Sequence, residues 1–329
     1  VEDGGRWESL AFADVDRRTT FSQPVWYRYL RLDADGRLRS VRYVDTYLPY
    51  PHPRDPDPAQ FYSALLSFSS YWAARISPGM TVELPETWIG DFVRHSFALE
   101  QITRSGDRPK YGVVDRIYGG AEHDGFPDIL TASMAAYLEW GMPDGAARYL
   151  DNYLAEFVRP DGSIDYRGPE IGQYGRILTL LAQYGAFTRD DTVLLKHEGK
   201  VRAIAAILLE RRREAKRRDP DAADHGMIAG RHEADISFDT PTLGVLDYER
   251  PYLSNSAEAA RGLRDLGREL AAAGRRQENL DWTSSGAQLE CEGLELVEDL
   301  RRSIARSWVE RDDFRQLPII AGSRILHRD

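Results

Sequence analysis

Links of alternating length between helix-forming segments constrain this chain most. Apolar residues recur every three or four positions in these segments, as Leu130, Met134 and Leu138 do, and this is the period of an amphipathic α-helix. Two of the links, 140–144 and 185–189, are short. We therefore expect the helices on either side of each short link to be antiparallel neighbours.

Three other links are long: 105–126, 159–170 and 219–253. In an up-and-down array of helices, a regular alternation of short and long links places every long link at the same end. A stretch of about 35 residues without regular structure is uncommon inside a compact domain unless it has a function. The shared end of the long links is therefore where we expect a functional site.

The first 58 residues differ from the rest of the chain. Residues from Val25 to Leu48 alternate in the manner of strands and are interrupted by Asp33–Gly36, which predicts a β-hairpin. Prolines then recur from Pro49 to Pro58 and form a stiff connector, because proline continues neither a strand nor a helix. The predicted fold is mainly α, with residues 1–58 as a β-rich segment and connector and residues 59–329 as a domain of helical hairpins.

Several polar residues near the ends of the expected helices have structural interpretations. Thr188 with Asp191, and Asn255 with Glu258, have the spacing of a capping box at the start of a helix. The basic residues from Arg211 to Arg218 end another helix, where the helix dipole and solvent both favour positive charge. We therefore assign no chemistry to these positions.

Composition argues against several functions. The formal net charge is -10, so nucleic acid and anionic membranes would be repelled on average. The single cysteine permits neither a disulfide framework nor a thiolate metal cluster, and no apolar run is long enough to span a membrane. We expect a soluble protein, cytoplasmic or secreted, that uses no metal or other cofactor. The chain begins at Val1 rather than methionine, which leaves room for a leader or an upstream region removed from it.

The first long link carries acidic residues among glycines. Glu122, Asp124 and Asp128, with His123 beside them, supply groups that can transfer protons, and the glycines let the backbone approach a ligand. The structural alternative is that Asp124 caps the helix that follows and that Asp128 complements its dipole.

The second long link places hydrogen-bonding side chains next to an aromatic ring. Tyr166, Arg167 and Glu170 suit the hydroxyl groups and the apolar C–H face of a sugar. Asp161 lies in a Pro-Asp-Gly sequence that is typical of a turn. The structural alternative for the other polar residues, which include Asp165, is an arginine–carboxylate pair that holds the link.

The third long link combines two histidines with several acids. The histidines lack the helical spacing of a zinc protease and no thiols assist them, which disfavours a metal site. Glu233 and Asp235 are the candidates for catalysis, and solvated surface is the alternative for the link as a whole. The candidate substrate-binding residues here are His225, Arg231, His232 and Tyr252.

Three short segments, together with the rhythm of helical hairpins, resemble the six-hairpin glycosidase superfamily, whose members are (α/α)6 toroids. The segments are Asp124–Pro127, Asp161–Tyr166 and Tyr252–Ser256, and the likeness covers roughly residues 61–308 without matching one family. Six hairpins need more helices than this chain carries. The resemblance therefore implies that the chain is a fragment or that further chain segments complete the ring, with a homo-oligomer as another expected assembly.

The resemblance implies hydrolysis of glycosidic bonds in an oligosaccharide or polysaccharide by two carboxyl groups. One protonates the departing oxygen, while the other activates water or attacks directly. Because the long links share one end, Glu122 or Asp124 of the first link would face Glu233 or Asp235 of the third. The residues expected to position the substrate are Tyr166, Arg167 and His232.

Two other functions fit the same residues. A polysaccharide lyase on a related helical toroid abstracts a proton with Tyr or His and neutralises a uronate with Arg. Those roles are open to Tyr166, Arg167, His225 and Arg231. A non-catalytic domain would instead bind glycans or mediate assembly of a larger protein. An unsaturated product that absorbs in the ultraviolet identifies the lyase, and binding without turnover identifies the non-catalytic domain.

Overall fold

The computed structural model describes two units of the chain. The described residues are 6–10, 26–32, 38–45, 58–104, 106–110, 125, 127–165, 170–232, 249–311 and 314–324. The first unit comprises 1–77, 84–103 and 110–124, and the second comprises 78–83, 104–109 and 125–329. Among the described helices, none is long and apolar enough to cross a membrane.

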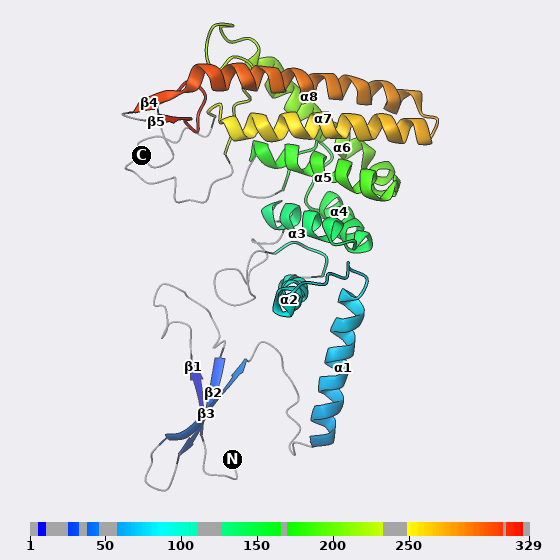
Figure 1. The fold of residues 1–329 in the computed structure, drawn as a ribbon, viewed down its shortest axis with the longest axis vertical. Coiled ribbons are helices and arrows are strands. Elements are labelled where there is room, and N and C mark those ends of the chain that lie inside the picture. The colour runs from blue at the N-terminus through cyan, green and yellow to red at the C-terminus, as the bar shows by residue number, and fades with distance from the viewer. Residues whose placement is uncertain are drawn as a thin grey trace. The chain divides into compact units, whose positions relative to one another are not determined.

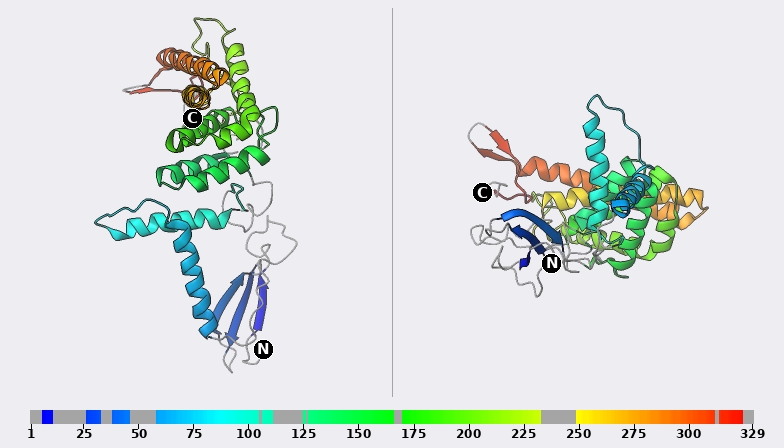
Figure 2. Two further views of the ribbon diagram at one scale, coloured as in Figure 1. Left: turned by 90° about the vertical axis from the view of Figure 1, so that its right-hand side faces the viewer. Right: turned by 90° about the horizontal axis from the view of Figure 1, so that it is seen from below.

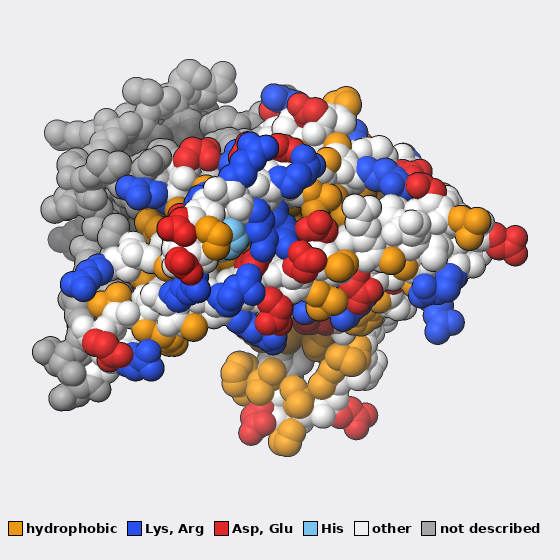
Figure 3. All heavy atoms as spheres, turned by 90° about the horizontal axis from the view of Figure 1, so that it is seen from above, with side chains coloured by type: hydrophobic (Ala, Val, Ile, Leu, Met, Phe, Trp, Pro, Cys, Tyr) orange, Lys and Arg blue, Asp and Glu red, His pale blue; other side chains and the backbone are white. Residues whose placement is uncertain are grey.

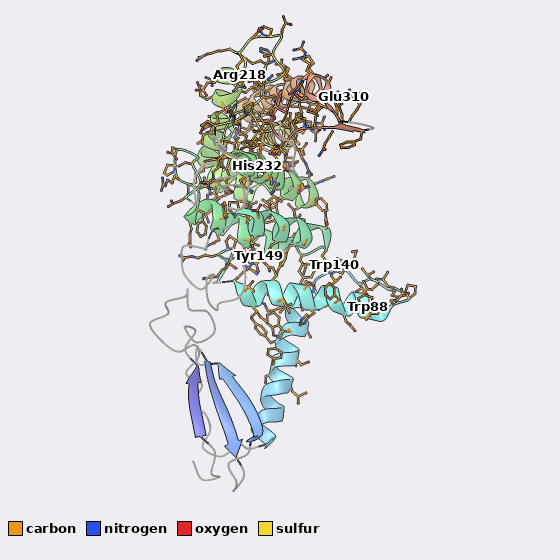
Figure 4. The ribbon with its side chains drawn as sticks, turned by 90° about the vertical axis from the view of Figure 1, so that its left-hand side faces the viewer. Trp88, Trp140, Tyr149, Arg218, His232 and Glu310 are labelled. Carbon is orange, nitrogen blue, oxygen red and sulfur yellow. The ribbon has the colours of Figure 1, made fainter. Side chains whose placement is uncertain are left out.

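The first unit holds a small antiparallel sheet and two helices. Strands β2 (Trp26–Leu32) and β3 (Leu38–Asp45) form the predicted hairpin, with Trp26 opposite Asp45 (Figure 1). Strand β1 (Arg6–Leu10) adds to the other edge of β2 and was not predicted from the sequence, because a single short strand gives little periodicity. The helices are α1 (Pro58–Ile76) and α2 (Thr87–Thr103), and Trp88 of α2, labelled in Figure 4, is exposed.

The described part of the second unit is built from three helical hairpins. Each is a pair of helices joined by a short link, and Figures 1 and 2 show the pairs stacked on one another. The pairs are α3 (Pro127–Glu139) with α4 (Pro143–Glu156), α5 (Ile171–Thr188) with α6 (Thr192–Ala215), and α7 (Leu253–Arg276) with α8 (Leu280–Ser307). Helix α5 packs against both α3 and α7, while α4 packs against α6. The prediction of antiparallel neighbours across the two short links is confirmed.

Apolar residues at the predicted helical spacing form the core of this unit. Leu130, Met134 and Leu138 of α3 are buried, and so are the apolar residues that recur at helical spacing in α5 and α7. Tyr149 of α4, labelled in Figure 4, is also buried, and its ring meets that of Tyr137 edge-on at 5.2 Å between centroids. A short hairpin of β4 (Val309–Arg311) and β5 (Phe314–Gln316) follows α8.

Glycines let α5 and α7 cross closely. A Cβ atom added to Gly262 of α7 would lie 2.3 Å from the carbonyl oxygen of Gly175 in α5, and one added to Gly175 would lie 2.2 Å from the carbonyl oxygen of Glu258. Neither contact is possible without moving a helix, because both obstacles are backbone atoms. This crossing therefore sets the separation of α5 from α7 next to Arg176 and Glu258.

Replacing Gly262 by alanine is expected to destabilise the chain. The added methyl group has to push α7 away from α5, which costs about 1–3 kcal/mol in the free energy of unfolding. Gly199 in the exposed face of α6 is the matched control, since its added Cβ meets nothing within 4 Å. Gly199→Ala should stabilise by about 0.5–1 kcal/mol. Urea unfolding of both variants measures the two changes, and effects of the same sign would contradict the close crossing.

Both predicted capping boxes are wrong. Thr188 is the last residue of α5 and Asp191 is the N-cap of α6 without a capping side-chain bond. Asp191 instead receives hydrogen bonds from Arg276 and Gln277. Burial alone raises the pKa of Asp191, but these hydrogen bonds and the charge of Arg276 outweigh it and hold the pKa below its usual value.

The second capping box fails because α7 begins earlier than its sequence pattern suggests. The helix starts at Leu253, which places Asn255 inside the first turn. Asn255 is buried and its Nδ2 donates to the carbonyl oxygens of Gly230 and Arg231, 3.0 and 3.2 Å away. Its side chain therefore fastens the α6–α7 link rather than capping its own helix.

The basic end of α6 is not simply a solvated surface, which corrects the interpretation of residues 211–218. Arg212 is 3% exposed and its guanidinium contacts Glu292, Glu295 and Asp299 of α8 at 2.8, 2.8 and 3.2 Å. Asp299 is 1% exposed and also pairs with Lys216 at 2.6 Å. Figure 3, which looks down on α8 and α6, shows acidic and basic side chains interspersed. Helices α6 and α8 are thus joined by a partly buried ionic network.

Candidate functional site

The described ends of the long links lie at one end of the hairpins. Ile171 donates its backbone N–H to the carbonyl oxygen of Arg231 at 3.1 Å, so the second and third links meet at the start of α5. The first link ends at Gly125, whose N–H donates to Pro109 and whose carbonyl oxygen accepts from the Tyr153 hydroxyl of α4 at 3.3 Å. Because α4 leads directly into the second link, these contacts place all three described link ends together.

A groove of about 530 Å³ begins at this end and is lined by the three helices that the long links precede. Its size lies within the range of roughly 300–1,000 Å³ that small-molecule sites occupy. The lining residues are Asp128, Thr131, Ala132, Ala135 and Glu139 of α3, Arg176, Thr179, Leu180 and Gln183 of α5, and Glu258 and Arg261 of α7.

Three charged side chains from three helices meet in the groove. Arg176 of α5 donates from Nη1 to Oδ1 of Asp128 in α3 at 3.0 Å and from Nε to Oε1 of Glu258 in α7 at 3.2 Å. About a third of each side chain remains exposed, with Asp128 at 28%, Arg176 at 34% and Glu258 at 27%. We call these three residues the acid–arginine cluster.

Each carboxylate of the cluster keeps one oxygen for a ligand. Among the described residues, Oδ2 of Asp128 and Oε2 of Glu258 accept no hydrogen bond, since both contacts of Asp128 and the single contact of Glu258 use the other oxygen. A half-exposed carboxylate oxygen is a strong acceptor for hydroxyl groups. The cluster therefore offers two acceptors that are fixed relative to each other by one guanidinium group.

Gln173 donates a hydrogen bond to Asp128 from a buried position in α5. It lies in the first turn of α5, is fully buried, and donates from Nε2 to Oδ1 of Asp128 at 2.8 Å. The amide nitrogen rather than the amide oxygen faces Asp128, because only the nitrogen can donate to a carboxylate. Asp128 is thus oriented by two donors of α5, and its role exceeds that of complementing the dipole of α3.

Six of the sequence-predicted site residues lie outside the described residues and stay predictions. They are Glu122, Asp124, Tyr166, Arg167, Glu233 and Asp235. Each belongs to a long link, and the described residues closest to them in sequence are Gly125, Asp165 and His232. The contacts of those three residues therefore show where the chain enters and leaves the undescribed parts of the links.

The other five predicted residues are described, and none of them is among those that line the groove. Glu170 and Arg231 form the backbone bridge between the second and third links. The ring of His232, labelled in Figure 4, packs on the ring of Tyr252 with 4.8 Å between their centroids. His225 contacts the carbonyl oxygen of Arg218 through Nδ1 at 2.9 Å. Four of them therefore surround the link end, whereas His225 lies where the third link leaves α6.

Two loop residues behave as their structural alternatives predicted. Asp161 accepts hydrogen bonds from the backbone and the hydroxyl of Ser163 within the predicted turn. Asp165 pairs with Arg159 at 2.7 Å, and both side chains are 58% exposed.

Within the described residues, no group of three or more His, Cys, Asp or Glu side chains could hold a metal ion.

Sequence reasoning missed Gln173, Arg176 and Glu258 as site residues. All three lie in the first or second turn of a helix that follows a long link. Polar residues are common at the starts of helices because they cap the helix, so residue type alone did not mark these three as site residues. What distinguishes them is that each follows a long link. That shared position is the signal that could have identified them.

No family model, curated protein or solved structure matches this chain. Neither a relative nor a structural neighbour therefore indicates an activity. The functional inference depends on the geometry and chemistry of the groove and of the link ends beside it.

Proposed function

We propose that this chain is a carbohydrate-active enzyme that hydrolyses glycosidic bonds at the shared end of its long links. One observation carries the proposal: Asp128 and Glu258, from different helices, contact the same arginine in a groove, and each has one oxygen that accepts no hydrogen bond from the described residues. In this proposal the three hairpins are part of an (α/α)6-type toroid, in which α3, α5 and α7 are the inner helices and α4, α6 and α8 the outer ones.

The proposed reaction divides its tasks between the groove and the links. Hydrolysis of a glycosidic bond needs one carboxylic acid to protonate the departing oxygen and one carboxylate to activate water or to attack the anomeric carbon. Asp128 and Glu258 are ion-paired with Arg176, so they suit the second task and the binding of sugar hydroxyl groups. We assign the acid to Glu122 or Asp124 of the first link or to Glu233 or Asp235 of the third.

The bonds and protons of the inverting form balance without a cofactor. The acid gives its proton to the oxygen that leaves, and water adds its oxygen to the anomeric carbon. The second proton of that water goes to the carboxylate base, so each product carries a new hydroxyl group. In the retaining form the carboxylate first bonds to the anomeric carbon, and water then releases it.

A uronate lyase is less well supported by the groove. That reaction needs an arginine free to neutralise the substrate carboxylate, whereas Arg176 already contacts two carboxylates of the protein. Of the four lyase candidates, His225 and Arg231 do not line the groove, and Tyr166 and Arg167 lie outside the described residues. The hydrolase therefore remains the proposal, and the appearance of an unsaturated product would replace it by the lyase.

Substitution of the acids tests the proposal. Release of reducing ends from a panel of neutral oligosaccharides is measured for Asp128→Asn, Glu258→Gln, Asp124→Asn and Glu233→Gln. We expect the variant that removes the acid or the base to lose about 10²–10⁴-fold in rate, because that is what one proton-transferring group contributes.

The control is Glu298→Gln, which removes an exposed carboxylate of α8 that pairs with Arg301 and should leave the rate unchanged. Wild-type rates for Asp124→Asn and Glu233→Gln, and also for Glu122→Gln and Asp235→Asn, would exclude the links from the mechanism. Wild-type rates for both Asp128→Asn and Glu258→Gln would show that the groove takes no part in the reaction.

A further inference from the structure

The groove extends well beyond the acid–arginine cluster. Asp128 lies in the first turn of α3 and Glu139 in its last, so a rise of about 1.5 Å per residue separates them by about 16 Å. Gln183 of α5 lies about 10 Å beyond Arg176 by the same measure. Helices α3 and α5 run in the same direction, because Asp128 at the start of one contacts Gln173 and Arg176 at the start of the other. The groove is therefore longer than any single pyranose ring.

The chemistry of the groove changes along its length. The acid–arginine cluster occupies the end near the links, and the lining beyond it includes Ala132, Ala135 and Leu180. Thr131 and Thr179 also line the groove, but their hydroxyl groups donate to carbonyl oxygens of their own helices. Glu139 and Gln183 lie at the far end. Within the part of the chain that the structure describes, neither of their side chains forms a hydrogen bond or an ion pair. The apolar side chains that line the groove between its two polar ends suit the C–H face of a sugar.

The charges along the groove disfavour an acidic ligand. Its lining holds three carboxylates, on Asp128, Glu139 and Glu258, against the two guanidinium groups of Arg176 and Arg261. Arg176 is already shared by two of those carboxylates, and Arg261 lies 3.6 Å from Asp265. A ligand with carboxylate or sulfate groups would therefore meet net repulsion, whereas hydroxyl groups find acceptors at both ends.

We infer that the groove binds a neutral oligosaccharide of several units that lies along α3 and α5, with a remote unit held by Glu139 and Gln183. This inference rests on the proposed function and adds the class of substrate: an uncharged sugar chain rather than a monosaccharide or a uronate polymer. The unit nearest the links contacts the acid–arginine cluster. Each further sugar unit adds affinity until the oligosaccharide is long enough to reach Glu139.

A length series of neutral linear oligosaccharides tests this inference. Affinity is measured by calorimetry, and kcat/KM by release of reducing ends, for the wild type and for the double variant Glu139→Ala/Gln183→Ala. Affinity of the wild type should rise with chain length up to the length of the groove. The double variant should bind the longest oligosaccharides about tenfold more weakly or worse, since it loses hydrogen bonds at two positions, while the affinity for a disaccharide stays unchanged.

Matched controls separate a local effect from a change in folding or overall charge. Glu214→Ala/Gln288→Ala removes the same two side-chain types from exposed positions of α6 and α8, outside the groove, and should keep the wild-type dependence on length. A uronic acid oligosaccharide of equal length should bind more weakly than the neutral one. Stronger binding of the acidic oligosaccharide would overturn the inference.

The outcomes distinguish this inference from the proposed function. Hydrolysis with the same affinity and the same kcat/KM for short and long oligosaccharides would overturn the inference and leave the function in place. Length-dependent binding that the double variant loses, without cleavage of any bond, would support the inference and refute the function. Absence of binding at every length would refute both.

Discussion

Arg212→Ala is expected to lower the free energy of unfolding by about 3 kcal/mol, near the lower end of the range for breaking a buried ion pair. Arg212 is 3% exposed and supports three carboxylates of α8, one of which, Asp299, is itself buried. Removing the guanidinium leaves Asp299 with Lys216 and Arg302 as its remaining partners. Those two cations still balance part of the negative charge of Asp299. We therefore do not expect the larger losses of unfolding free energy in that range.

Arg213 provides the control one residue away. Its side chain is 65% exposed and pairs with Glu210 on the surface of α6, so Arg213→Ala should change the free energy of unfolding by about 0.5 kcal/mol or less. Urea unfolding followed by far-ultraviolet circular dichroism measures both variants. Equal effects of the two substitutions would contradict a buried network between α6 and α8.

A double variant distinguishes the burial of charge from the loss of side-chain volume. Arg212→Met with Asp299→Leu replaces the buried pair by apolar side chains of similar size. It should recover most of the stability that Arg212→Ala loses, because an isolated buried charge is no longer present. A double variant as unstable as Arg212→Ala would indicate that packing, rather than charge, explains the effect.

Arg176→Met is expected to reduce kcat/KM for glycoside cleavage by about 10²-fold or more. Arg176 is the only residue of the described groove lining that contacts both Asp128 and Glu258, and without it the two carboxylates repel each other. Displacement of a catalytic group by about 1 Å costs on the order of 10²-fold in rate. The substitution therefore affects activity through the position of the acids.

Arg176→Lys should fall between the wild type and Arg176→Met. Lysine keeps the positive charge but lacks the planar fork that reaches two carboxylates at once. Arg268→Met removes an exposed arginine of α7 that pairs with Glu290 and should leave kcat/KM unchanged. A wild-type rate for Arg176→Met, with folding confirmed by circular dichroism, would contradict the role of the acid–arginine cluster.

The arrangement of helices in the second unit was largely predictable from the sequence. Link lengths determined the antiparallel pairing of α3 with α4 and of α5 with α6, because a short link leaves the next helix no other direction. The same alternation indicated that the long links share an end, and the contact between Ile171 and Arg231 agrees with it. Periodicity and link length are local properties, so a single sequence reveals them.

The acid–arginine cluster was not predictable in the same way. Asp128, Arg176 and Glu258 are far apart in the sequence; Arg176 meets Glu258 beside the close crossing of α5 and α7 at Gly175 and Gly262, and it meets Asp128 where α5 packs on α3. Glu258 also had a local explanation as part of a capping box, and Arg212 had one as a solvated end of a helix. Tertiary contacts overrode both local explanations, and no periodic pattern announces such contacts.

The most direct measurement follows the anomeric protons of a neutral linear oligosaccharide by nuclear magnetic resonance while the full chain acts on it. We expect signals of new reducing ends to appear with the wild-type protein, without the ultraviolet absorbance of an unsaturated sugar, and we expect Asp128→Asn to slow their appearance. An oligosaccharide that binds in the groove and shows no new anomeric signal over prolonged incubation would contradict hydrolysis and identify a domain that binds glycans without cleaving them.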